Sequence, residues 1–162
     1  MDRSTPTQTA ATGGPVLPIS MEEAGRQANP AKDGPIIFFD GVCGLCNRFV
    51  DFVIRRDRTG VFRFAPLQGE TARERLPEAD VRDLNTVVLW EEQGVFRKST
   101  AAARILMQLG GAWRFAGAVI RVIPRPLRDV GYTLVARYRY ALFGKKETCR
   151  VPAPAERSRF LP

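Results

Sequence analysis

The spacing of apolar residues changes several times along the chain, and each change predicts a new element. Residues 36–40 form a continuous apolar run, which is typical of a buried strand. From Cys43 the apolar positions recur every three or four residues until Gly60, which predicts a helix. Residues 61–67 alternate and predict a second strand, and residues 69–76 predict a short polar helix.

The next part of the chain predicts a hairpin followed by a helix. Residues 86–91 and 95–98 are rich in β-forming side chains and flank a Glu-Gln-Gly turn, which favours an antiparallel pair. A helix over 101–109 follows, and we expect Ser99 or Thr100 to cap its N-terminus.

Two further helices are predicted at the C-terminal end. The first covers 112–123 and ends before a proline. The second begins at Pro126 and ends at Gly144. Its apolar residues step by three or four: Leu127, Val130, Leu134, Tyr138 and Leu142. The order β-α-β-α-β-β-α is a thioredoxin-like α/β core, to which these two helices are additions.

Composition divides the chain into a tail and one domain. At 162 residues, with 44% hydrophobic and 26% charged residues, the chain is long enough for one globular core. Residues 1–34 are rich in Thr, Pro, Gly and Ala, so we expect a disordered tail without a signal peptide, followed by a single domain over 35–162. We expect no transmembrane helix, because arginines and a Gly-Gly pair interrupt the most apolar stretch, 101–123.

Cys43 and Cys46 carry the candidate chemistry. Residues three apart share a helical face, so the two thiols can come within disulfide reach. Unpaired N–H groups and the helix dipole favour a thiolate at the helix N-terminus, which makes Cys43 the expected nucleophile and Cys46 the resolving thiol. Asp40 ends the preceding strand. Its carboxylate can relay a proton or cap the helix.

Other interpretations of the cysteines remain open. The pair can consist of ordinary buried apolar residues, or it can be half of a zinc site. The chain has no histidine and Cys149 is its one other cysteine, so a zinc site would need carboxylates or a second subunit. We expect neither a metal nor a cofactor. Cys149 either exchanges with the pair or is inert, and we favour the inert role.

The net charge of +8 indicates a basic surface. Basic residues gather at 55–58, at Arg137 and Arg139, and at 145–146, without a recognisable nucleic-acid module. We therefore expect no specific nucleic-acid partner, and at most weak attraction to anionic surfaces. A lone Cys-x-x-Cys in a cysteine-poor chain suits a reducing compartment, so we predict a cytoplasmic protein.

The run from Phe39 to Asn47, FDGVCGLCN, resembles the signature of the DCC family of thiol–disulfide oxidoreductases, named for the positions of Asp40, Cys43 and Cys46 here. The segments 64–68, 141–146 and 159–161 are also similar to that family, so the resemblance covers about 35–161. It implies a small thioredoxin-like redox protein, without indicating a substrate.

One feature of thioredoxins is missing from the sequence. The position expected for their cis-proline falls near Thr86-Val87, and we expect a trans bond there.

The leading hypothesis is an oxidoreductase in which Cys43 attacks a protein or small-molecule disulfide and Cys46 releases the reduced product. The alternative is a non-catalytic module that senses redox state or holds a metal together with a protein partner.

Overall fold

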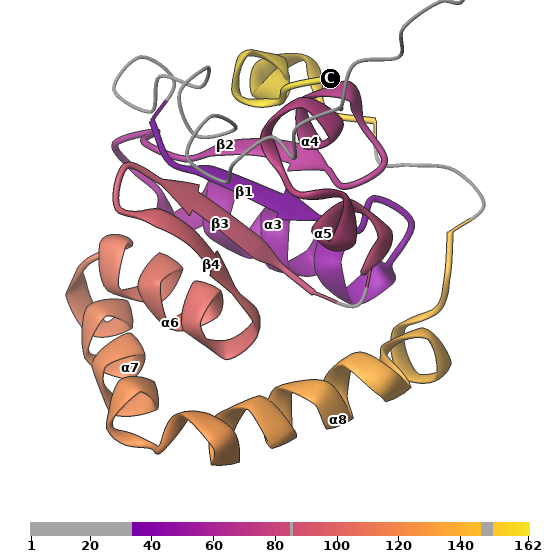
Figure 1. The fold of residues 1–162 in the computed structure, drawn as a ribbon. Coiled ribbons are helices and arrows are strands. Elements are labelled where there is room, and N and C mark those ends of the chain that lie inside the picture. The colour runs from indigo at the N-terminus through magenta and orange to yellow at the C-terminus, as the bar shows by residue number, and fades with distance from the viewer. Residues whose placement is uncertain (1–33, 85, 147–150) are drawn as a thin grey trace, which may run out of the picture.

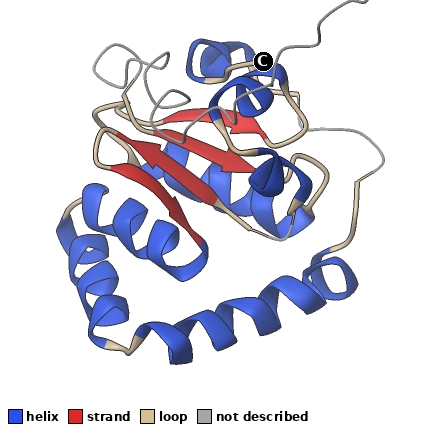
Figure 2. Cartoon of the chain, viewed as in Figure 1, coloured by secondary structure: helices blue, strands red, loops and turns tan. Residues whose placement is uncertain are grey.

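The computed structural model describes residues 34–84, 86–146 and 151–162. It has a four-stranded mixed sheet with helices on both faces (Figure 2). The strands are β1 (Ile36–Phe39), β2 (Arg63–Pro66), β3 (Val88–Glu91) and β4 (Gly94–Arg97), in the order β2-β1-β3-β4. β1 pairs parallel with β2 and antiparallel with β3, and β3 pairs antiparallel with β4. This arrangement confirms the thioredoxin-like α/β prediction.

The helices are α3 (Gly44–Arg56), α4 (Glu70–Arg75), α5 (Glu78–Arg82), α6 (Lys98–Gln108), α7 (Gly111–Val122) and α8 (Arg125–Phe143), followed by the 3-10 helix η1 (Pro154–Arg159). Every helix that the sequence predicts between Cys43 and Gly144 is present in the structure. The sequence did not predict α5 or η1, because these helices are only five and six residues long and lack an apolar period. The predicted tail over residues 1–34 lies almost entirely outside the described residues.

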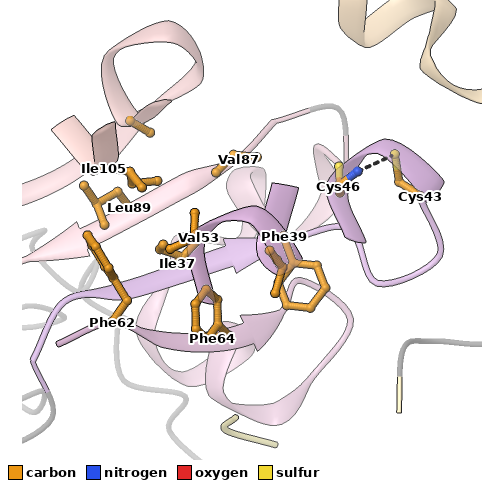
Figure 3. Packing of buried hydrophobic residues seen from close by; sticks show 12 residues of the cluster. Ile37, Phe39, Cys43, Cys46, Val53, Phe62, Phe64, Val87, Leu89 and Ile105 are labelled. Atoms are coloured by element: carbon orange, nitrogen blue, oxygen red, sulfur yellow. Dashed lines mark hydrogen bonds between the residues drawn. The ribbon is translucent and has the colours of Figure 1, made fainter. Parts of the chain in front are cut away.

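Alternate residues of β1 supply two separate cores. Ile37 and Phe39 face α3 and α6, where they pack with Val50, Val53 and other buried residues (Figure 3). Ile36 and Phe38 face α4. A strand buried on both faces needs a continuous apolar sequence, which is what residues 36–39 provide.

The chain end covers the outer side of β2. Phe160, just after η1, stacks on Phe64 at 5.3 Å between ring centroids and meets Phe39 edge-on. The N–H of Leu161 donates to the carbonyl of Phe64 at 2.8 Å. The final residues therefore protect an edge strand that would otherwise expose unpaired backbone groups.

α7 and α8 extend around the outside of the core (Figure 1). The predicted periodic residues of α8 are exposed: Leu127, Val130, Leu134, Tyr138 and Leu142. The expected cap of α6 was wrong, because its N-cap is Arg97 and no side-chain cap bond forms. Among the described residues, no helix combines the length and apolarity that crossing a bilayer requires.

Candidate functional site

Cys43 lies immediately before α3 and caps it with its own sulfur. Its backbone is extended, and its Sγ accepts the N–H of Cys46 at 3.4 Å (Figure 3). Both thiols are free, so the structure is of the reduced state. The capping role considered for Asp40 therefore belongs to Cys43. The Cys43 sulfur therefore lies at the positive end of the helix dipole and faces a backbone donor.

The Cys46 thiol is held in its protonated form. Burial raises its pKa to about 12, and a hydrogen bond to Cys43 and the charge of Cys43 add to this effect. Arg139 acts in the opposite direction, and Asp40 raises the pKa slightly further. The Cys46 thiol therefore stays protonated near neutral pH.

Asp40 is fully buried just after β1, and both its oxygens accept hydrogen bonds. Its Oδ1 accepts the Val42 N–H at 3.1 Å and the Gln68 side-chain amide at 2.8 Å. Its Oδ2 accepts Arg139 Nη2 at 3.2 Å and the Tyr140 hydroxyl. The carboxylate thus fixes the loop before Cys43 to β2 and α8, because its partners come from each of these regions.

Arg139 is a site residue that the sequence reasoning placed wrongly. We expected it on the basic surface, but its side chain is buried and pairs with Asp40. It also donates to the Leu84 carbonyl at 2.9 Å and to the Tyr140 hydroxyl at 2.7 Å. A second period on α8 (Tyr132, Ala136, Arg139) was the signal available in the sequence, and the stronger apolar period obscured it.

The residues after α8 cover Cys43. We call Gly144–Lys146 the α8 tail. The N–H of Gly44 donates to the Gly144 carbonyl at 3.2 Å, and that of Lys146 donates to the Val42 carbonyl at 2.8 Å. Cys43 and Lys145 form an isolated antiparallel bridge, and Cys43 is fully buried.

An apolar pocket of about 160 Å³ lies beside Cys46 rather than Cys43. α3 contributes Leu45 and Phe49, and α8 contributes Tyr132 and Val135. Cys46, at 7% exposure, is the more accessible thiol. An apolar cavity therefore lies directly beside the cysteine pair.

The backbone before β3 differs from the thioredoxin pattern, as the missing proline predicted. The Thr86–Val87 bond is trans, like every peptide bond in the described residues. The Val87 N–H donates to the Tyr132 hydroxyl at 2.8 Å. Burial raises the pKa of Tyr132, so this hydroxyl stays protonated near neutral pH. The backbone donor at this position is thus already satisfied from α8.

The structure brings Asp40, Cys43 and Cys46 to one end of α3, together with Arg139, Tyr140 and Gln68. Cys149 lies outside the described residues. Within the ranges that the structure describes, no three Cys, Asp or Glu side chains are grouped closely enough to hold a metal ion.

The fold and the Cys-x-x-Cys at the start of α3 define a thioredoxin-like dithiol protein. Residues 37–145 match the model of the DCC1-like thiol-disulfide oxidoreductase family. The chain therefore belongs to this family.

Two relatives extend this match. YuxK of Bacillus subtilis (strain 168) is 40% identical over 129 residues, which are 78% of this chain and 93% of YuxK. A chloroplastic DCC family protein of Arabidopsis thaliana, At1g52590, is 35% identical over 119 residues, which are 72% of this chain and 69% of that protein. No solved structure matches significantly.

Proposed function

We propose that the chain is a dithiol–disulfide oxidoreductase in which Cys43 attacks and Cys46 resolves. The observation that carries the proposal is the asymmetry of the pair. The Cys43 sulfur accepts a backbone N–H at the helix N-terminus, whereas the pKa of Cys46 is raised to about 12. Membership of the DCC1-like family supports the same chemistry.

In the first step, the Cys43 thiolate attacks one sulfur of a substrate disulfide. A Cys43–substrate bond forms, the substrate disulfide breaks, and its leaving thiolate takes a proton from solvent. This step removes the negative charge from Cys43. The hydrogen bond to Cys43 and the charge of Cys43 both raise the pKa of Cys46. Once Cys43 is bound to the substrate, these two influences are lost, so the pKa of Cys46 falls at the step in which Cys46 reacts.

In the second step, Cys46 loses its proton to solvent and attacks the Cys43 sulfur. The Cys43–Cys46 disulfide forms, the Cys43–substrate bond breaks, and the second substrate sulfur leaves as a thiolate that takes a proton from solvent. The substrate is thereby reduced by two electrons and the pair is oxidised. A dithiol reductant then returns the pair to the reduced state. Asp40 has a positioning role here, because its four hydrogen bonds hold the loop that presents Cys43.

The test combines redox titration with cysteine variants. The purified chain is equilibrated in graded dithiol/disulfide buffers, its free thiols are alkylated, and the adducts are counted by mass. We expect a reversible two-electron transition at Cys43 and Cys46. Cys43→Ser should abolish turnover of a model disulfide, Cys46→Ser should trap a mixed disulfide, and the matched control Cys149→Ser should behave as wild type. Full turnover by Cys43→Ser would end the proposal.

One observation favours the alternative, a redox-sensing module. The α8 tail buries Cys43, which is the expected nucleophile. A sensor needs one oxidation event that changes its partner, whereas an enzyme needs repeated access to substrate. Multiple turnovers per molecule favour the oxidoreductase. A single oxidation without turnover, or stoichiometric zinc or iron in anaerobically purified protein, favours the module.

A further inference from the structure

α7 and α8 expose their apolar stripes to solvent, which is the reverse of the usual orientation. On α8 the stripe consists of Leu127, Val130, Leu134, Tyr138 and Leu142, which are three or four residues apart and therefore share a face. On α7 it consists of Phe115, Val119 and Val122. Val122 is 84% exposed and Leu142 is 72% exposed, so neighbouring described residues cover little of this surface.

The opposite faces of the two helices make the contacts with the core. On α8, Tyr132 accepts the Val87 N–H and Arg139 pairs with Asp40. On α7, Trp113 meets Phe52 edge-on at 4.6 Å between ring centroids. Both helices are therefore attached to the core through one side, and within the described ranges their apolar stripes remain exposed. We call these two stripes together the α7–α8 face.

The charge beside this face has one sign. Residues 111–143 contain one acidic residue, Asp129, and six arginines. Arg139 is buried on the opposite side, which leaves the following five: Arg114, Arg121, Arg125, Arg128 and Arg137. Asp129 accepts a hydrogen bond from Ser99 and lies 3.7 Å from Arg125, so it is already engaged. Arg114, Arg121 and Arg137 are exposed.

An apolar face flanked by arginines distinguishes between two possible partners, a second copy of the chain and a lipid bilayer. In a symmetric dimer the same patch would face itself, and arginines would meet arginines without acidic partners. An acidic bilayer offers both an apolar layer and anionic headgroups. A helix with a wide apolar face and flanking arginines lies in such an interface with its apolar side chains inserted. We propose that the α7–α8 face binds the surface of a bilayer containing anionic lipids.

The same helix connects this face to the cysteine site. Val135 of α8 lines the pocket beside Cys46 and is itself half exposed. Docking through α8 would therefore place the pocket close to the headgroup region. The binding surface does not depend on the redox chemistry, so the two proposals can fail separately.

The experiment measures sedimentation of the full chain with vesicles. One set is phosphatidylcholine alone and the other contains about a third phosphatidylglycerol, which supplies the negative surface potential. We expect binding to the anionic vesicles at least tenfold stronger than to the neutral ones. Binding should also weaken at about 1 M salt, where the Debye length falls to about 3 Å.

Three matched valine variants locate the surface. Val122→Glu and Val130→Glu should each weaken binding about tenfold or more, because a carboxylate would enter the apolar layer. Val151→Glu is the control, since Val151 is 81% exposed but lies outside both helices. It should bind as wild type. Arg121→Gln should weaken binding roughly fivefold through the loss of one headgroup attraction.

Circular dichroism and thermal melting keep the result interpretable. Both valines are exposed, so the variants should melt as wild type. If Val130→Glu melts early, Val122→Glu at the end of α7 provides the test. Equal binding to both vesicle types, or wild-type binding by a folded Val122→Glu, would overturn the proposal. Concentration-dependent dimers that Val122→Glu disrupts, with no vesicle binding, would also overturn it and identify the face as a protein interface.

Discussion

At the scale of single residues, the candidate site contains a buried ion pair beside the cysteines. Asp40 and Arg139 are almost fully buried and lie 3.2 Å apart, although 99 positions separate them in the chain. Breaking such a pair leaves an uncompensated charge in the interior, which is costly even where the intact pair contributes little to stability. The pair thus connects the loop before Cys43 to α8.

Replacing Arg139 by methionine should lower the free energy of unfolding by about 3–5 kcal/mol, because Asp40 would remain buried without its cation. Urea denaturation measures the change. The matched control is Arg137→Met, two residues earlier and exposed, which should stay within about 0.5 kcal/mol of wild type. The double variant Asp40→Asn, Arg139→Met should lose less stability than Arg139→Met alone. Equal stability of the two single variants would contradict the structural role of the pair.

At the scale of elements, α3 and the α8 tail meet where Cys43 is buried. Gly44, the first residue of α3, lies so close to the end of α8 that an added Cβ would be 2.2 Å from the Phe143 carbonyl oxygen. Only glycine permits this approach. The tail then crosses the loop of Cys43 and makes two backbone hydrogen bonds there.

Gly44→Ala should therefore displace the α8 tail. We expect a loss of about 1–3 kcal/mol in stability from the steric conflict. We also expect faster alkylation of Cys43, measured by mass spectrometry after iodoacetamide pulses. Gly131→Ala is the control, because Gly131 lies in α8 with nothing near its Cβ position. It should stabilise the chain by about 0.5–1 kcal/mol without changing alkylation. Unchanged alkylation in a folded Gly44→Ala would show that the tail does not limit access.

α8 also shows what a sequence can predict about an element. Its apolar period, Pro126 and Gly144 predicted a helix, and the helix runs from Arg125 to Phe143. The period did not reveal which side faces the core, because periodicity measures amphipathicity and not the identity of the neighbour. The inward side of α8 is held by Tyr132 and Arg139, whose partners lie far away in the chain. Asp40 and the cysteines were identifiable because their chemistry is local in sequence.

At the scale of the whole molecule, the burial provided by one of the two cores is linked to the protonation of one thiol. Cys46 belongs to the core between the sheet and α3, and burial is the largest influence on its pKa. A folded-state pKa of about 12 lies above the usual cysteine value, so the folded state retains a proton that the unfolded chain releases. Folding stability is therefore coupled to pH in the alkaline range.

The direction of this pH dependence follows because the folded state favours the neutral, protonated thiol of Cys46. The contribution of Cys46 is fully present below the unfolded-state pKa, near 9, and is lost as pH rises toward about 12. The free energy of unfolding of the reduced chain should thus fall as pH rises above about 9, as urea melts at stepped pH would show. Cys46→Ala, compared in a Cys149→Ser background, should flatten this dependence even if it lowers stability overall. Tyr132, whose pKa is raised mainly by burial, remains in both chains, so most of its contribution cancels in the comparison and only the part that comes from the charge of Cys46 does not. An equally steep fall in Cys46→Ala would mean that Cys46 does not keep its proton in the folded core.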